Sequence, residues 1–242
     1  MKVLVLSDVH GNFEALESVI KESRQFNWKE LWFLGDISGY GPEPDKCFRL
    51  LSTFKLVFIP GNHDLYYAGR LSRDFFSREA LGALILTGSK IKADFKQILK
   101  EIPVIQKRRG ITLVHGSVMN PEREYILFED DARRNFDSFK GSCCLFGHTH
   151  RQGFFVKEED EIRWVKPEIG EIVSYKKNRL LVNPGSVGQP RDKDPRAGWA
   201  ILDTTKKELQ FFRTEYNIEE TVKKMKALGS SDYLLRRLET GS

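Results

Sequence analysis

Apolar residues in the first quarter of the chain form short continuous runs, separated by segments with helical spacing. The continuous runs cover residues 3–6, 31–34 and 56–59. Runs of this length are typical of strands buried on both faces. Between the first two, Phe13, Leu16 and Ile20 recur at helical spacing behind Asn12, a residue suited to capping a helix. A second helix is predicted over 47–54, so the alternation indicates βαβ units and a sheet with parallel pairs.

The pattern changes twice further along the chain. Residues 66–103 have helical spacing throughout, which predicts a helical segment able to act as a partial lid. Strands are predicted at 111–114 and 143–146, with a helix over 131–139 between them. Six apolar segments separated by turns then predict strands at 154–156, 162–165, 169–175, 180–182, 199–202 and 209–212. We expect these later strands to form a second sheet stacked on the first.

The end of the chain predicts one closing helix over 218–228, followed by residues that fray. No linker, internal repeat or low-complexity tract interrupts the sequence, so we predict a single α/β domain over 1–242. Residues 66–103 would be its partial lid and 216–242 a C-terminal helical extension. No apolar run approaches the roughly 20 residues of a spanning helix, and the N-terminal run is too short for a signal peptide. We therefore expect a cytoplasmic protein with no membrane partner.

Composition narrows the class of protein. With 242 residues, 40% of them hydrophobic and 30% charged, the chain can bury a core without disulfides or a structural metal. The net charge of +5 is mild and argues against a nucleic acid as the partner. The three cysteines, of which Cys143 and Cys144 are adjacent, cannot form a disulfide framework, so a reducing compartment is expected.

Five predicted strands end in polar motifs that together contain all five histidines of the chain. These motifs are Asp8-Val9-His10, Gly35-Asp36, Gly61-Asn62-His63-Asp64, His115-Gly116 and Gly147-His148-Thr149-His150. Ligands of open α/β sheets gather at the carboxyl ends of the strands, so these side chains should converge on one site.

Imidazole, carboxylate and amide groups without thiolates suit divalent ions of borderline hardness. Manganese is the expected ion, with iron, zinc, nickel or magnesium as alternatives. The candidates are too many for one tetrahedral ion, so two ions sharing a carboxylate fit better. Two divalent ions carry four positive charges, and Asp8, Asp36 and a bridging hydroxide together carry three negative ones. The centre therefore keeps about one positive charge. Such a centre attracts an anion and lowers the pKa of bound water, which indicates a phosphate substrate.

The five motifs in combination resemble those of the calcineurin-like metallophosphoesterase superfamily, and the resemblance extends to about residue 203. Residues 36–42 and 183–188 are similar to segments of its small single-domain prokaryotic phosphodiesterases. The resemblance implies a four-layer α/β/β/α sandwich of two mixed sheets flanked by helices.

The resemblance also implies a role for each motif residue. The first metal would be held by Asp8, His10, Asp36 and His150. Asp36 would bridge to a second metal, completed by Asn62, His115 and His148. A hydroxide between the metals would attack phosphorus, and His63 would protonate or stabilise the leaving oxygen, a role that imidazole can fill because it can be protonated near neutral pH.

One departure from the family pattern bears on the substrate. The protein phosphatases of the superfamily carry Asp and Arg where this chain has Gly39 and Tyr40, so the carboxylate that orients the catalytic histidine is missing. This departure argues against a protein phosphatase. Because no large cap domain is present to grip a polymer, we expect hydrolysis of a small phosphodiester, including nucleotide derivatives. The alternatives are a phosphomonoesterase or serine/threonine protein phosphatase, then a nuclease, and, in another class, a non-catalytic scaffold with this fold.

Three further residues are weighed as substrate contacts. Tyr40 and Tyr66 follow metal motifs and can stack on a nucleobase or pack in the core, while Arg191 can contact phosphate or lie in a solvated charged loop. The segment 183–186 is either a simple turn or a loop beside the metals. The sequence leaves homo-oligomerisation open.

Overall fold

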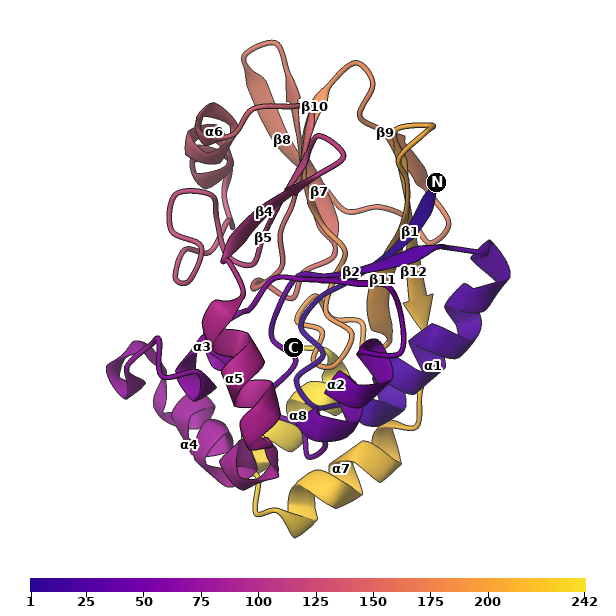
Figure 1. The fold of residues 1–242 in the computed structure, drawn as a ribbon. Coiled ribbons are helices and arrows are strands. Elements are labelled where there is room, and N and C mark those ends of the chain that lie inside the picture. The colour runs from indigo at the N-terminus through magenta and orange to yellow at the C-terminus, as the bar shows by residue number, and fades with distance from the viewer.

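Two six-stranded mixed sheets lie face to face between layers of helices in the computed structural model, which describes residues 1–242 (Figure 1). The first sheet contains, in spatial order, β3 (Leu56–Phe58), β2 (Glu30–Phe33), β1 (Lys2–Leu6), β11 (Ala197–Asp203), β12 (Glu208–Thr214) and β9 (Ile172–Ser174). The second contains β4 (Ile105–Arg108), β5 (Ile111–Val114), β6 (Cys143–Leu145), β10 (Arg179–Asn183), β7 (Gly153–Glu158) and β8 (Glu161–Val165).

Some of the eight α-helices cover the outer faces of the sheets, and others pack on one another. The helices are α1 (Phe13–Ser23), α2 (Pro44–Leu51), α3 (Asn62–Tyr67), α4 (Arg78–Thr87), α5 (Ala93–Glu101), α6 (Glu129–Ser138), α7 (Ile218–Ala227) and α8 (Asp232–Thr240). Residues of α1, α2 and α5 pack on the first sheet, and α6 alone packs on the second. This arrangement confirms the α/β class and the four-layer sandwich. None of the helices combines the length and apolar character needed to cross a membrane.

The first strand shows why the sequence has a continuous apolar run at 3–6. Val3 and Val5 face the second sheet and belong to the core between the sheets. Leu4 and Leu6 point the other way, into the core beneath α1 and α2. Because successive side chains of a strand alternate between its faces, burial of both faces requires apolar residues at every position.

The predicted division of strands between the sheets was wrong. Strands β9, β11 and β12 come late in the chain but belong to the first sheet, where β1 pairs parallel with β2 and antiparallel with β11. Strands β5 and β6 belong to the second sheet, beside the late strand β10. The partners of a strand lie far away in the sequence. Because a strand buried on both faces is apolar at every position, its hydrophobic pattern does not indicate which sheet it joins.

Two elements differ from the sequence prediction. Strand β4 was not predicted, because its sequence Ile-Gln-Lys-Arg has the exposed polar residues of an edge strand. The last residues do not fray: α8 buries Leu234, Leu235 and Leu238 and ends at Gly241, whose φ is +67°. These leucines pack with residues of α4 and α7, so the C-terminal extension is part of the folded core.

Candidate metal centre

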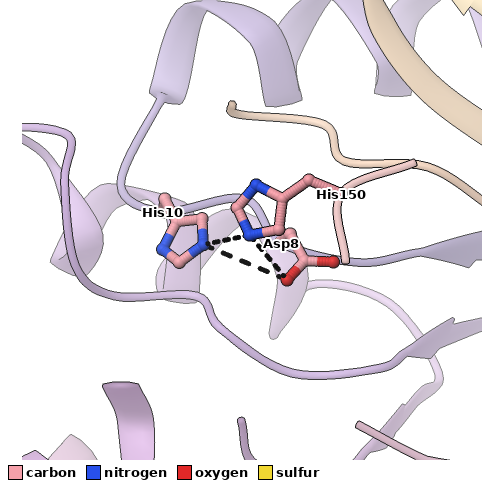
Figure 2. A group of neighbouring side chains, drawn as sticks. All are labelled: Asp8, His10 and His150. Atoms are coloured by element: carbon pink, nitrogen blue, oxygen red, sulfur yellow. Dashed lines mark hydrogen bonds and ion pairs between the residues drawn. The ribbon is translucent and has the colours of Figure 1, made fainter. Parts of the chain in front are cut away.

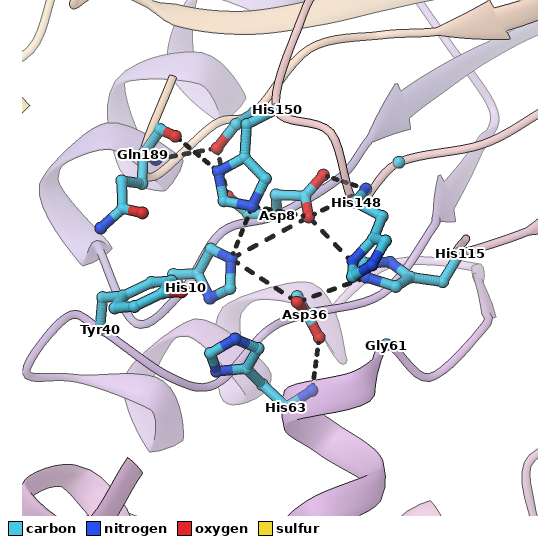
Figure 3. A network of polar contacts seen from close by, with 12 residues as sticks. Asp8, His10, Asp36, Tyr40, Gly61, His63, His115, His148, His150 and Gln189 are labelled. Atoms are coloured by element: carbon cyan, nitrogen blue, oxygen red, sulfur yellow. Dashed lines mark hydrogen bonds and ion pairs between the residues drawn. The ribbon is translucent and has the colours of Figure 1, made fainter. Parts of the chain in front are cut away.

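The polar motifs converge at the carboxyl ends of strands in both sheets, as the sequence predicted. Six buried side chains with metal-binding chemistry lie together there: Asp8, His10, Asp36, His115, His148 and His150 (Figure 3). The buried side chain of Asn62 lies next to His115. These residues follow β1, β2, β3, β5 and β6, so the interface between the two sheets positions them.

The first group of ligand atoms consists of Asp8, His10 and His150 (Figure 2). Nε2 of His150 lies 3.1 Å from Nε2 of His10 and 3.3 Å from Oδ1 of Asp8. Nε2 of His10 lies 4.0 Å from the same Asp8 oxygen. Three donor atoms this close together can contact one cation at their centre.

The second group consists of Asp36, His115 and His148. Oδ2 of Asp36 lies 3.3 Å from Nε2 of His115 and 3.6 Å from Nε2 of His10, so this carboxylate lies between the two groups. Nε2 of His115 is also 3.2 Å from Oδ1 of Asn62. Asp36 therefore lies within reach of ligand atoms from both groups.

The hydrogen bonds on the outer side of the histidines determine what their inner nitrogens can do. Nδ1 of His10, His115 and His150 faces a main-chain carbonyl oxygen in each case. The acceptors are those of Ser38 (2.8 Å), Leu34 (2.7 Å) and Gln189 (2.6 Å), respectively. Because a carbonyl oxygen only accepts, each Nδ1 carries a proton, and each ring in its neutral form directs an Nε2 lone pair into the centre. Nε2 of His148 is buried with no hydrogen-bond partner. Converging lone pairs and carboxylates fit divalent cations.

The electrostatics of the cluster show the same demand for positive charge. Burial opposes ionisation of Asp8, but the neighbouring His150 and His115 lower its pKa nonetheless. Burial likewise opposes protonation of His115, yet the charges of Asp36 and Asp8 raise its pKa to about 9. Burial lowers the pKa of His10 and of His148. Without a cation, one imidazole of the cluster carries the charge that the two carboxylates favour.

Backbone strain is concentrated at the same residues. Five of the ten non-glycine residues with positive φ are in this centre: Asp8 (53°), His10 (48°), Asp36 (59°), His148 (65°) and His150 (58°). Each such residue costs about 1–3 kcal/mol, and strain of this kind clusters at functional sites. The neighbouring chain must also come close, since a Cβ on Gly61 would lie 2.0 Å from Oδ1 of Asp36.

Asp64 fixes the loop that carries Asp36, a role that the sequence reasoning missed. Its buried carboxylate accepts main-chain N–H bonds from Asp36 (2.8 Å), Ile37 (3.3 Å), Ser38 (3.1 Å) and Gly61 (3.1 Å), and the Ser38 hydroxyl (2.7 Å). Burial and the charge of Asp36 raise the pKa of Asp64 to about 7. The sequence feature that could have identified Asp64 is its place directly after His63 in the third motif.

The segment 183–186 lies beside the centre and is more than a turn. Asn183 donates from Nδ2 to the carbonyl of Gly147 at 2.8 Å, and the Ser186 hydroxyl donates to the carbonyl of Asp8 at 2.8 Å. Both bonds hold the backbone of segments that carry metal-binding side chains.

His63 lies against aromatic rings at the edge of the centre. Its ring contacts His10 edge-on (4.8 Å between centroids), Tyr40 at a tilt (4.9 Å) and Phe76 edge-on (5.3 Å). Its Nδ1 has no hydrogen-bond partner, and a Cβ on Gly39 would lie 2.6 Å from that atom. No carboxylate therefore orients the imidazole from the position where protein phosphatases carry one. Burial lowers the pKa of His63 to about 4, so the ring is neutral at pH 7.

Two of the three residues weighed as substrate contacts lie beside the centre. Tyr40 and Arg191 line a cavity of about 480 Å³ together with Asn62 and His63. Nη2 of Arg191 donates to the Tyr40 hydroxyl at 3.2 Å. Tyr66 is not among the residues lining this cavity, and its ring packs instead against Tyr67 and Phe76.

Comparison with known proteins agrees with this geometry. The sequence model of the calcineurin-like phosphoesterase superfamily domain matches residues 1–207. The chain belongs to the calcineurin-like phosphoesterase superfamily. Membership implies hydrolysis of phosphate esters with divalent metal ions, and the clustered histidines and aspartates provide candidate ligands.

Individual members of the superfamily match most of the chain. An uncharacterised protein of Methanocaldococcus jannaschii is 31% identical over 99% of this chain and 98% of its own length. The phosphodiesterase YfcE of Escherichia coli is 26% identical over 84% of this chain and 88% of its own length. The crystal structure of a metallophosphoesterase from Sphaerobacter thermophilus superposes with a TM-score of 0.90 at 36% identity, covering 100% of this chain and 99% of that one.

Proposed function

We propose that this calcineurin-like phosphoesterase hydrolyses a small phosphodiester, including nucleotide-derived diesters, at a centre that holds two divalent metal ions. The observation that carries the proposal is the place of Asp36, whose Oδ2 lies 3.6 Å from His10 in one group and 3.3 Å from His115 in the other. A shared carboxylate is what two adjacent metal sites require. The Escherichia coli relative YfcE is a phosphodiesterase, which supports the diester class.

Each of the two groups of ligand atoms described above would form one metal site. Asp8, His10 and His150 would complete the first site with Asp36. Asn62, His115 and His148 would complete the second with the same carboxylate. Ions bound there, manganese in our proposal, supply Lewis-acid chemistry that lowers the pKa of water and offsets negative charge on phosphoryl oxygens.

His63 would act on the leaving group. It lines the cavity beside Asn62, its ring is neutral at pH 7, and Asp36 orients its backbone by accepting the His63 N–H at 2.9 Å. A neutral imidazole retains one N–H, which can donate a hydrogen bond that stabilises the departing oxygen. The aromatic contacts with His10, Tyr40 and Phe76 hold the ring in place of the missing carboxylate.

The alternatives differ in how well the site supports them. A phosphomonoesterase needs the same metal ligands and is the second candidate. A serine/threonine protein phosphatase is disfavoured because Gly39 leaves Nδ1 of His63 without a carboxylate. A non-catalytic scaffold has no need for the complete set of ligands or for a histidine at position 63.

The test is a substrate panel with manganese-loaded protein at equal substrate concentrations. We expect bis(p-nitrophenyl) phosphate to be hydrolysed with a kcat/KM at least about tenfold above that of p-nitrophenyl phosphate, a difference of about 1.4 kcal/mol in transition-state binding. A dinucleoside polyphosphate is the third substrate. Preference for the monoester would support the phosphomonoesterase, and no turnover of any ester would contradict an enzymatic function.

A further inference from the structure

The cavity that opens beside His63 and Asn62, here called the side cavity, is lined by chain segments far apart in the sequence. Arg123 comes from the loop after β5, Arg191 from the loop after β10 and Arg237 from α8. Its volume of about 480 Å³ is in the range of small-molecule sites. Because two residues of the proposed active site form part of its wall, a molecule bound there would be continuous with the reacting group.

The three arginines of the side cavity form no ion pair with an Asp or Glu side chain. None of these side chains lies within 4.0 Å of the guanidinium of Arg123, Arg191 or Arg237, whereas other arginines of the chain, such as Arg49, Arg134 and Arg213, are paired. Guanidinium groups that line a cavity without a carboxylate partner are suited to bind phosphate, for which their planar fork has the matching geometry.

The contacts of these arginines fix their positions and leave donors free. Arg191 donates through Nη2 to Gln189 (2.8 Å) and Tyr40 (3.2 Å), while its Nε is buried with no partner. Arg237 donates to the Tyr233 hydroxyl and, through Nε, to the main-chain oxygen of Ser242 (2.8 Å). Each guanidinium therefore retains N–H groups beyond those used to hold it.

Arg123 is positioned by stacking, since its guanidinium carbon lies 4.4 Å from the centroid of the Phe75 ring.

Two acidic residues also line the side cavity, but they do not neutralise it. Asp74 is highly exposed (86%) and lies 3.8 Å from Arg73, and Glu79 is exposed on α4. Burial and the nearby charge of Arg191 lower the pKa of Arg237, so the two guanidiniums are close enough to repel. An anion between them would relieve that repulsion.

We propose that the side cavity binds a second phosphate group of the substrate, so that the substrate is a phosphate ester with at least two phosphates. The inference rests on the proposed function, because it assumes that the first phosphate lies at the metal centre. The second phosphate belongs to the leaving-group side, where His63 lines the cavity. The rings of Tyr125 and Tyr233 in the same wall offer surfaces for a nucleobase, so a nucleotide phosphodiester and a sugar phosphodiester, each carrying a second phosphate, are the two sources to distinguish.

Equilibrium binding to the manganese-loaded protein, measured by isothermal titration calorimetry, tests the proposal. Two ligand pairs differ in the second phosphate: adenosine 5′-(α,β-methylene)diphosphate against AMP, and fructose 1,6-bisphosphate against fructose 6-phosphate. In at least one pair we expect the two-phosphate ligand to bind about tenfold more tightly, as a charge-assisted phosphate contact predicts. The pair that shows the larger ratio identifies the source of the second phosphate.

Arg237→Gln should reduce that ratio to about threefold or less, and Arg123→Gln, on a different element, should reduce it as well. Arg236→Gln is the matched control, since Arg236 is the exposed neighbour on α8 and does not line the side cavity. Equal thermal unfolding midpoints would show that the variants are folded. A ratio near one in the unmodified protein, or an unchanged ratio in both cavity variants, would overturn the proposal. The proposed function is tested separately by the ester panel, whose failure would leave the measured binding ratio intact.

Discussion

The carboxylate of Asp64 accepts the main-chain N–H of Asp36 at 2.8 Å. The same carboxylate bonds to the next two residues of the loop and to Gly61, so one buried side chain orients the strand end that presents Asp36. Asp36 has a φ of 59°, a strained backbone that the surrounding bonds must hold. The geometry of the proposed bridging ligand thus depends on a residue that is not itself one of the proposed metal ligands.

Asp64→Ala should lower the free energy of unfolding by about 3 kcal/mol, because it leaves several buried N–H groups without an acceptor. It should also lower the manganese content of the purified protein. Denaturant unfolding and mass spectrometry of bound metal check the two effects. Asp64→Asn retains one acceptor oxygen and should therefore recover part of the lost stability and part of the lost manganese. Normal metal content in the alanine variant would contradict a positioning role for Asp64.

Asp36→Asn should remove most of the bound metal and reduce kcat/KM by more than about 100-fold. Loss of a residue that only hydrogen-bonds to a metal ligand already reduces metal affinity or activity by roughly 10–100-fold. Metal analysis and hydrolysis of bis(p-nitrophenyl) phosphate check this. In the unmodified protein, manganese at about 100 times its Kd should add about 2.7 kcal/mol of stability, and the variant should show little of that gain. Asp137→Asn, at an exposed aspartate (67%) paired with Lys157, is the control. Retention of both metal and activity would rule out the bridging role.

His63→Ala should leave the metal content near normal while slowing hydrolysis according to the leaving group. An alkyl ester needs a proton at its leaving oxygen, so we expect a loss of about 100-fold or more. A p-nitrophenyl ester leaves readily as the phenolate and should lose much less. The slope of log kcat/KM against the pKa of the leaving group measures the difference. An equal loss for every substrate would mean that His63 does not assist departure.

Gly39→Ala should impair the enzyme more than the fold. Gly39 has a φ of +131°, and a Cβ there would lie 2.6 Å from Nδ1 of His63 and 2.7 Å from Nδ1 of His10. Displacing catalytic groups by about 1 Å can cost roughly 100-fold in rate. Gly82→Ala, in α4 where a Cβ meets nothing within 4 Å, is the control and should be neutral or slightly stabilising. If both variants retained full activity, His63 would not require its observed position.

The strands with two buried faces and the polar motifs that follow them could be predicted because their signals are local. A run such as Val3–Leu6 is apolar at every position, and each motif directly follows its strand. Which sheet a strand joins depends on partners up to 200 residues away, as Lys2 opposite Asp203 shows. The side cavity could not be predicted from the sequence because it too depends on contacts between distant segments. Arg123 and Arg237 lie far apart in the sequence, and only the fold places them in one wall.

The place of β1 between β2 and β11 has a consequence for how the chain folds during synthesis. A nascent chain of 150 residues already contains every proposed metal ligand, but it lacks β10, β11 and β12. One edge of β1 then has no partner, and the carbonyl of Asp8 lacks the bonds that it accepts from Gly188 and Ser186. Unpaired strand edges promote aggregation of partly folded chains. Premature uptake of metal by such an intermediate would trap ligands before the two sheets that position them are complete.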